Sequence, residues 1–256
     1  MGSLDFYAEE LGRQGLIIPP FCNRDMLGRM VDIVREQSPD MDSKLVSVLS
    51  EVYTPAWFAT MVVSRYAQTP VIKEYAITIS EAIEAHLLGL DHIAVAGLMP
   101  IIEGAIVKLG LANGISARKT MKQKVVALTT CAIEKNRTKK LGDYEEVDSM
   151  LRSFMAFLET FFYENSERYP LPDKTNRNGI LHGAYADIDY GHPINFYKTL
   201  TALNMLCWIS EFNPFAPKNT PESQALAAYY LSMIRLRPQV KAGCHELIFG
   251  ATSEAR

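Results

Sequence analysis

The chain has 256 residues, of which 48% are hydrophobic, 21% charged and 10% aromatic. This composition excludes disordered, collagen-like and low-complexity proteins, and a chain of this length buries enough surface to fold without disulfides or a structural metal. The 26 Lys and Arg against 29 Asp and Glu give a formal net charge of -3, so no global charge attracts nucleic acid or an anionic membrane. Any polyanion must therefore be held by a local site.

The cysteines and the N-terminus indicate a cytoplasmic protein. Four cysteines lie far apart without a C-x-x-C pair, which favours a reducing compartment. The N-terminal residues MGSLDFYAEE lack the basic and apolar regions of a signal peptide. The most apolar stretch, residues 93–111, contains Pro100, Glu103 and Lys108, and so predicts a buried helix pair rather than a membrane span.

The spacing of apolar residues predicts an all-α, multi-helix fold, because they recur every three or four positions and long alternating runs are missing. In chain order, helices are predicted at 23–37, about 42–53, 54–66, 71–89, 91 to about 110, about 143–166, from about 174, from 193 and at 222–235. Asn23 and Thr54-Pro55 mark two of the starts, as a capping residue and as a cap followed by a first-position proline. The pair 71–89 and 91–110 is expected to form an antiparallel hairpin. The helix from 193 is apolar on nearly all sides, which predicts a central position.

One segment, residues 117–140, is strongly basic. It holds a single acidic residue, Glu134, and eight cationic ones: Arg118, Lys119, Lys122, Lys124, Lys135, Arg137, Lys139 and Lys140. Two interpretations stay open at this point, a solvated helix face and a surface that attracts phosphates. The acidic residues that follow, LGDYEEVD, are also able to neutralise it.

Familiar nucleotide, hydrolase and metal motifs are missing. The sequence has no Walker loop, no G-x-G-x-x-G turn after a strand, no G-x-S-x-G elbow and no H-E-x-x-H helix. None of the five histidines has a Glu three residues before it, as a di-iron helical bundle requires. We therefore expect no metal and no cofactor.

Residues 176–183, Asn-Arg-Asn-Gly-Ile-Leu-His-Gly, stand out. A helix is predicted here with Thr175 as its cap, which places Asn178 and His182 on one face and lets the long side chain of Arg177 curl back toward them. Gly179 and Gly183 each weaken such a helix by about 1 kcal/mol relative to Ala. Close approach of another backbone or of a ligand would explain both glycines.

The three polar side chains of this segment suit phosphodiester transfer without a metal. The imidazole of His182 can take a proton from a ribose 2′-hydroxyl or give one to the leaving oxygen. The guanidinium of Arg177 can hold the non-bridging phosphate oxygens, and Asn178 can orient either group. One histidine does not easily act as both acid and base, so two copies facing each other across a dimer are a natural solution. The alternative is a structural network in which Arg177 pairs with a carboxylate and His182 is a buried core residue.

The sequence Arg177-Asn178-Gly179-Ile180-Leu181-His182 resembles the R-x4-6-H signature of the HEPN superfamily of helical nucleotide-binding domains. The segment LMPIIEGAIVKL, which contains Glu103 and Gly104, also resembles an earlier helix of bacterial HEPN-like proteins. The resemblance covers roughly residues 70–235. It divides the chain into an N-terminal helical extension at 1–69, an HEPN-like bundle at 70–235 and a C-terminal tail at 236–256.

The resemblance implies a metal-independent endoribonuclease, typically dimeric, of the kind used in phage defence, toxin–antitoxin pairs or RNA processing. Arg177, Asn178 and His182 would be catalytic, and Glu103 a supporting acid that orients Arg177 or His182. The basic segment, with Arg118, Lys119, Lys122 and Lys124, would bind RNA. The expected partners are RNA or a nucleotide, a second copy of the chain and an antitoxin or regulatory protein, with no membrane. Many HEPN-like domains are not nucleases, so the alternative is a catalytically silent domain that binds a nucleotide or a protein.

Overall fold

The computed structural model describes residues 4–140, 143–211, 218–239 and 248. Helices account for nearly all regular structure in these residues, and no strand occurs among them. The predicted all-α, multi-helix fold is therefore confirmed.

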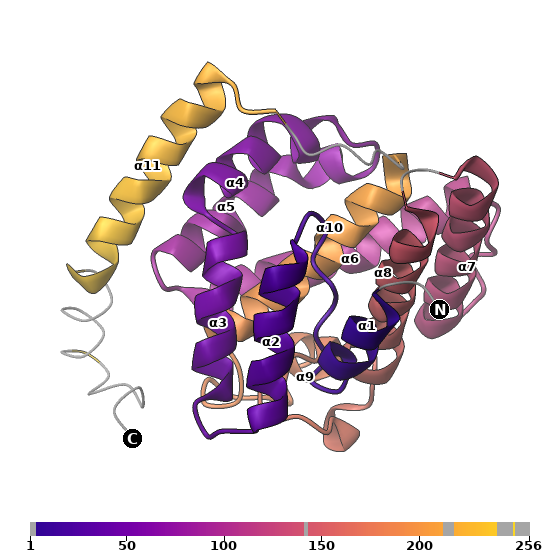
Figure 1. Ribbon diagram of the computed structural model, residues 1–256, viewed down its shortest axis with the longest axis horizontal. Helices are drawn as coiled ribbons and strands as arrows, with labels where there is room; N and C mark the ends of the chain where they lie inside the picture. The colour runs from indigo at the N-terminus through magenta and orange to yellow at the C-terminus, as the bar shows by residue number, and fades with distance from the viewer. Residues whose placement is uncertain (1–3, 141–142, 212–217, 240–247, 249–256) are drawn as a thin grey trace.

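The α-helices of the described residues, drawn in Figure 1, range from 5 residues in α9 to 22 in α6. They are α1 (Asp5–Gly12), α2 (Arg24–Glu36), α3 (Met41–Val52), α4 (Pro55–Thr60), α5 (Ala76–Leu87), α6 (Asp91–Ala112), α7 (Met121–Lys139), α8 (Tyr144–Phe157), α9 (Arg177–Leu181), α10 (Pro193–Glu211) and α11 (Pro221–Arg237). Two π-helical turns, η1 (Met61–Tyr66) and η3 (Leu158–Phe162), continue α4 and α8, and two 3-10 turns are η2 (Ile72–Tyr75) and η4 (Ser166–Arg168).

The predicted helix starts are confirmed where a capping side chain marks them. The side chain of Asn23 accepts a hydrogen bond from the backbone N–H of Met26, 2.9 Å away, and begins α2. Thr54 does the same for Trp57 and is followed by Pro55 at the first helical position. These local contacts satisfy backbone donors that the first turn leaves unpaired, so the sequence specifies them directly.

The α5–α6 hairpin and α10 form the centre of the fold (Figure 1). All residues of α10 from Ile194 to Ile209 are buried, which confirms its predicted central position. The buried apolar side chains form one cluster that extends from Leu4 to Met233. The division into an extension and a bundle at residue 69 stays a prediction, and most of the expected tail at 236–256 lies outside the described residues.

The stretch expected to form a buried helix pair at 93–111 is instead one continuous helix, α6, with Pro100 inside it. The proline removes only one backbone hydrogen bond, and close packing on both sides of α6 holds the helix together across that gap. By length and composition α6 is able to cross a membrane, and 56% of its most apolar window is buried inside the protein, as in a core helix.

Candidate functional site

The motif segment is held by a short helix whose cap differs from the prediction. Helix α9 spans only Arg177–Leu181, and its cap is Asn176, not Thr175. The Oδ1 atom of Asn176 accepts a hydrogen bond from the N–H of Gly179 at 2.7 Å, and its Nδ2 atom donates to the carbonyls of Phe161 and Glu164 at 2.8 and 2.9 Å. This buried side chain therefore starts α9 and also ties it to the end of the α8–η3 helix.

The two glycines of the segment are explained by a side chain and by the backbone, not by a ligand. A Cβ atom at Gly179 would lie 2.1 Å from the ring of Tyr185, which packs against this position. Gly183 has a φ of +69°, a conformation that residues with a side chain rarely adopt, and it follows the end of α9. The hydroxyl of Tyr185 donates to the carbonyl of Ser166 at 2.8 Å. The loop after the motif is thereby folded back over α9.

Four polar side chains meet at α9, and we call them the motif cluster: Glu103, Arg177, Asn178 and His182. The Nη1 atom of Arg177 lies 2.8 Å from Nε2 of His182 and 3.2 Å from Oδ1 of Asn178. Its Nε and Nη2 atoms each lie 2.7 Å from Oε2 of Glu103, which α6 contributes. The structure thus brings together all four residues that the sequence analysis singled out as catalytic or supporting.

The contact between Arg177 and His182 fixes the role of one imidazole nitrogen. Guanidinium has donors only, so Nε2 of His182 must accept the hydrogen bond and carry a lone pair. The proton of the neutral ring then lies on Nδ1. His182 is exposed, whereas the side chains of Arg177 and Glu103 are 20% and 28% exposed. The structural alternative is therefore right in one part and wrong in the other. Arg177 does pair with a carboxylate, but His182 is not a buried core residue.

A second polar group lies on the other side of Asn176 and is sealed from solvent. We call it the anchor cluster, and it consists of Tyr169, Asp173, Thr175, Asn195 and Lys198. Lys198 Nζ lies 3.0 Å from Asp173 Oδ2, and the two side chains are 4% and 3% exposed. Tyr169 and Thr175 also donate hydrogen bonds to the carboxylate of Asp173, and Asn195 donates to the backbone carbonyl of Asp173. The Thr175 hydroxyl is therefore used inside the protein, which is why it does not cap α9.

Sequence reasoning missed the anchor cluster, although one signal was present. Lys198 is the one charged residue in the run INFYKTLTALNML of α10. A lysine buried in a central helix requires an acidic partner. That partner, Asp173, lies in a loop 25 positions earlier, so the sequence alone gave no reason to choose it.

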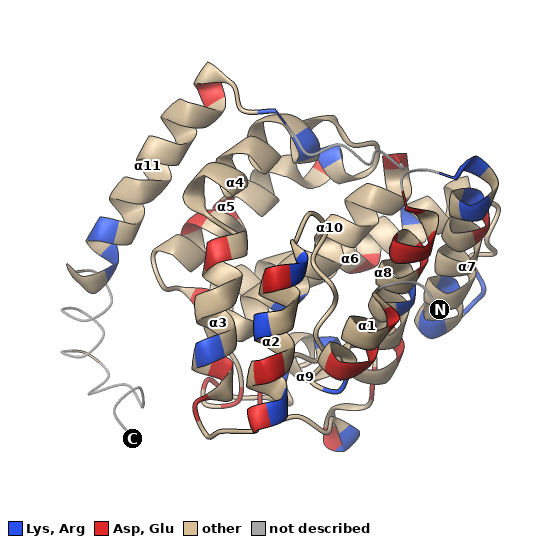
Figure 2. Cartoon of the chain, viewed as in Figure 1, with Lys and Arg blue, Asp and Glu red and all other residues tan. Residues whose placement is uncertain are grey.

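The basic segment divides into free cations and cations engaged in ion pairs. Lys122, near the start of α7, pairs with Glu164 at 2.8 Å, and the backbone carbonyl of Glu164 accepts hydrogen bonds from Asn176 and Asn178. Lys122 is therefore connected to the motif cluster through one residue. Arg118 and Lys119 are exposed ahead of α7, and Lys124 is half-buried on its first turns. Figure 2 shows the basic residues of α7 at the right of the molecule.

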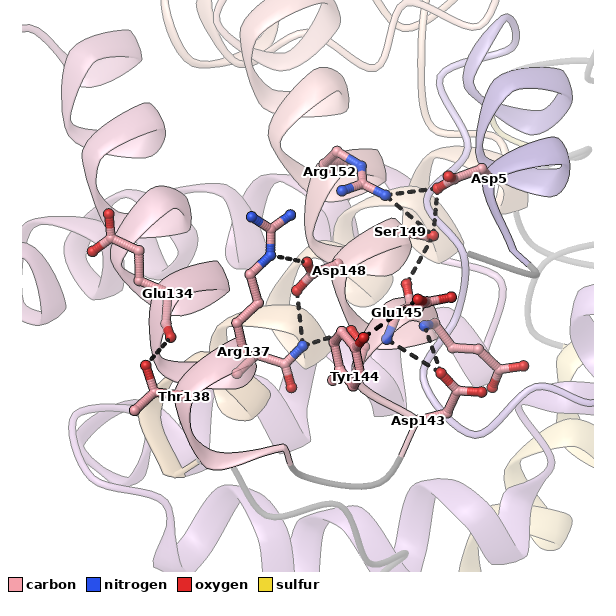
Figure 3. A network of polar contacts seen from close by, with 12 residues as sticks. Asp5, Glu134, Arg137, Thr138, Asp143, Tyr144, Glu145, Asp148, Ser149 and Arg152 are labelled. Atoms are coloured by element: carbon pink, nitrogen blue, oxygen red, sulfur yellow. Dashed lines mark hydrogen bonds and ion pairs between the residues drawn. The ribbon is translucent and has the colours of Figure 1, made fainter. Parts of the chain in front are cut away.

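The C-terminal end of α7 contacts α8 through an ion pair and a hydrogen bond (Figure 3). The Nε atom of Arg137 donates to Asp148 at 2.6 Å, and Nδ2 of the buried Asn136 donates to the same carboxylate at 2.8 Å. The acidic segment after the basic one thus neutralises part of it, as one interpretation of the sequence held. Lys135, Lys139 and Lys140 toward this end are exposed, as are Arg118 and Lys119 ahead of α7, so both ends of the basic segment keep cations that face solvent.

In the described part of the chain, no group of three or more His, Cys, Asp or Glu side chains is placed to hold a metal ion. The motif cluster contributes one carboxylate, and it is already paired with Arg177. The expectation of a site without metal or cofactor stays a prediction.

No protein-family model, no curated protein and no solved structure matches this chain.

Proposed function

We propose that the chain is a metal-independent endoribonuclease of HEPN type, in which Arg177, Asn178 and His182 form the reactive site and Glu103 positions Arg177. The observation that carries this proposal is the contact of 2.8 Å between Arg177 Nη1 and the exposed His182 Nε2. A cation that holds a phosphate and a base that takes the proton of the neighbouring 2′-hydroxyl must lie close enough to contact the same phosphodiester group. These two groups satisfy that requirement.

The proposed reaction needs two imidazoles. The bound phosphate draws Nη1 of Arg177 away from His182, which frees the lone pair on Nε2. One His182 then takes the proton of a ribose 2′-hydroxyl at Nε2, and the 2′-oxygen attacks the adjacent phosphorus. The bond between phosphorus and the 5′-oxygen breaks, and this oxygen takes a proton from the imidazolium of His182 of a second copy. The products are a 2′,3′-cyclic phosphate and a 5′-hydroxyl. Arg177 stabilises the charge that builds up on the non-bridging oxygens.

Glu103 has a defined part in this proposal. It binds Nε and Nη2 of Arg177, which leaves Nη1 directed toward Asn178 and His182. A planar guanidinium held on one edge by a carboxylate presents its other edge in a fixed orientation. RNA would reach the site along Arg118, Lys119 and Lys124, in a cytoplasmic setting in phage defence or a toxin–antitoxin pair, where an antitoxin or regulatory protein would control it.

Labelled RNA incubated with the pure protein in EDTA tests the proposal. The wild type is expected to cleave, and His182→Ala and Arg177→Ala are each expected to lower the rate by about a hundredfold or more. The matched controls are His192→Ala and Arg235→Ala, which remove an exposed imidazole and an exposed guanidinium elsewhere. Cleavage that survives both site substitutions would refute the assignment of the site.

One observation favours a second candidate, a catalytically silent HEPN-like domain that binds a nucleotide or a protein. Four hydrogen bonds and ion-pair contacts already engage Arg177 within the protein. A guanidinium so engaged is also suited to a purely structural role. Wild-type protein that cleaves none of a varied set of RNAs, but binds a nucleotide or a partner, would decide for this candidate.

A further inference from the structure

A cavity of about 450 Å³ lies between the start of α2, the end of α3 and α4. Its lining residues are Phe21, Asn23, Met26, Glu51, Val52, Ala56, Trp57, Thr60, Met61 and Asn219. None of them belongs to the motif cluster, the anchor cluster or the basic segment. The volume is in the range of roughly 300–1,000 Å³ that is common for small-molecule sites.

The backbone around this cavity is irregular at two points. Phe21 has a φ of +66°, although a bulky side chain is strained in that region, and the residue is 38% exposed. Helix α4 passes into the π-helical turn η1 at Met61, another lining residue. Strained residues and π-helical turns both concentrate at functional sites, where surrounding structure maintains them for a purpose other than stability.

The apolar part of the lining is suited to a flat ring. Phe21 and Trp57 supply aromatic faces, and Met26 and Met61 supply polarizable thioethers that adapt to aromatic partners. Trp57 is half-buried, with its ring in edge-to-face contact with Tyr53 at 4.8 Å. Packing against Tyr53 holds the indole in place, so a ring entering the cavity meets a fixed surface.

The polar part of the lining carries no net charge. Glu51 is the one ionisable lining residue, and both of its oxygens accept hydrogen bonds from Arg29, at 2.6 and 2.7 Å. These bonds lower the pKa of Glu51, so the pair is a carboxylate and a guanidinium that cancel. The Oδ1 atoms of Asn23 and Asn219 accept from the N–H of Met26 and the hydroxyl of Ser223, and the Thr60 hydroxyl donates to the carbonyl of Ala56. Among the described contacts of the lining, the Nδ2 groups of the two asparagines remain as neutral donors.

The geometry points to a second, independent binding site in this cavity, for an uncharged planar aromatic heterocycle of about the size of a purine. The rings stack on Trp57 and Phe21, and the acceptor atoms at the edge of the heterocycle bind the Nδ2 groups of Asn23 and Asn219. An anionic ligand is disfavoured because no Lys, Arg or His lines the described cavity, and the guanidinium of Arg29, which contacts the lining residue Glu51, is occupied by it. The inference does not depend on the proposed ribonuclease activity.

Tryptophan fluorescence and protein NMR test this inference with adenine as the probe. The chain has two tryptophans, and Trp208 is buried whereas Trp57 lines the cavity. Adenine is expected to quench Trp57 saturably and to shift the signals of residues that line the cavity. AMP, which adds a phosphate to the same base, is expected to bind about tenfold more weakly or worse, because its charge has no partner there.

Two variants make the test specific. Ala56→Phe fills the cavity from an exposed position of α4 and is expected to abolish adenine binding without unfolding the protein. Ala228→Phe adds the same ring at an exposed position of α11 and is expected to leave adenine binding unchanged. The inference is overturned if adenine does not bind saturably, if Ala56→Phe binds it as the wild type does, or if AMP binds as tightly as adenine.

Discussion

Asp173 of the anchor cluster and Arg177 of the motif cluster lie on either side of Asn176 in the chain, and the two clusters differ in their access to water. Asp173 and Lys198 of the anchor cluster are 3% and 4% exposed and are surrounded by hydrogen-bonding partners. In the motif cluster, Arg177 is 20% exposed and His182 is exposed. The sealed cluster has no surface to offer a ligand and stabilises the fold, whereas the open one keeps a base and a cation where a ligand can reach them.

The largest effect on stability is expected when the buried ion pair of the anchor cluster is broken. Lys198→Met keeps most of the side-chain volume but leaves the carboxylate of Asp173 buried without its cation, and we expect a loss of about 3–5 kcal/mol in the free energy of unfolding. Urea denaturation at neutral pH measures it. The double variant Lys198→Met with Asp173→Asn removes both charges and is expected to recover part of the loss.

The same kind of substitution in the motif cluster provides the matched comparison of unfolding free energies. Arg177→Met removes a cation from a partly exposed pair, and we expect it to cost only about 1–2 kcal/mol. Equal losses for Lys198→Met and Arg177→Met would contradict the distinction between a stabilising and an accessible cluster.

A smaller effect is expected where the loop after the motif covers α9. Gly179→Ala places a Cβ atom 2.1 Å from the ring of Tyr185. Overpacking of this kind costs about 1–3 kcal/mol, and we expect thermal unfolding to show a lower Tm. Adding Tyr185→Ser makes room for the methyl group and is expected to remove most of the penalty from the alanine. A wild-type Tm for Gly179→Ala alone would mean that the ring does not pack there.

The hydroxyl of Tyr185 adds a pH dependence to the same contact. Burial raises the pKa of Tyr185 to about 12, above the ordinary value of a tyrosine. Below pH 10 the folded and the unfolded chain both keep this proton, so the hydroxyl contributes its full stabilisation. Above pH 10 the unfolded chain loses the proton first, and the free energy of unfolding falls. Tyr185→Phe is expected to cost about 1 kcal/mol at pH 8 through the lost hydrogen bond to Ser166.

The measurement is the difference in unfolding free energy between wild type and Tyr185→Phe from pH 8 to 12. This difference is expected to shrink as pH rises through the interval between the unfolded and the folded pKa. A difference that stays constant over the whole range would show that Tyr185 ionises alike in both states.

The smallest changes in stability are expected when the cations near the start of α7 are replaced. The salt dependence of RNA binding then distinguishes the paired cation from the others. Arg118→Ala, Lys119→Ala and Lys124→Ala are each expected to change stability by less than about 0.5 kcal/mol and, as RNA contacts, to reduce the salt slope of RNA binding by about one. Lys122→Ala should leave the slope unchanged, because Lys122 is paired with Glu164. Filter binding at several salt concentrations measures these slopes. A full unit of slope lost with Lys122→Ala would mean that RNA displaces Glu164.

Local patterns were enough to predict most helix positions. Asn23 and Thr54 cap α2 and α4 with their own side chains, and the apolar spacing located the α5–α6 hairpin and α10. The prediction failed at Thr175, whose hydroxyl binds Asp173 in the buried cluster instead of capping α9. A cap depends on a competition between local and distant partners, and the distant partner was not visible in the sequence.

The sequence by itself determined the all-α fold and the proximity of Arg177, Asn178 and His182, because helical periodicity and contacts within six positions follow from local geometry. Only the tertiary structure decided that Glu103, 74 positions away, holds Arg177, that Lys198 neutralises Asp173, and that His182 stays exposed. Pairing over such separations and access to water depend on how the helices pack, and packing is a property of the whole folded chain.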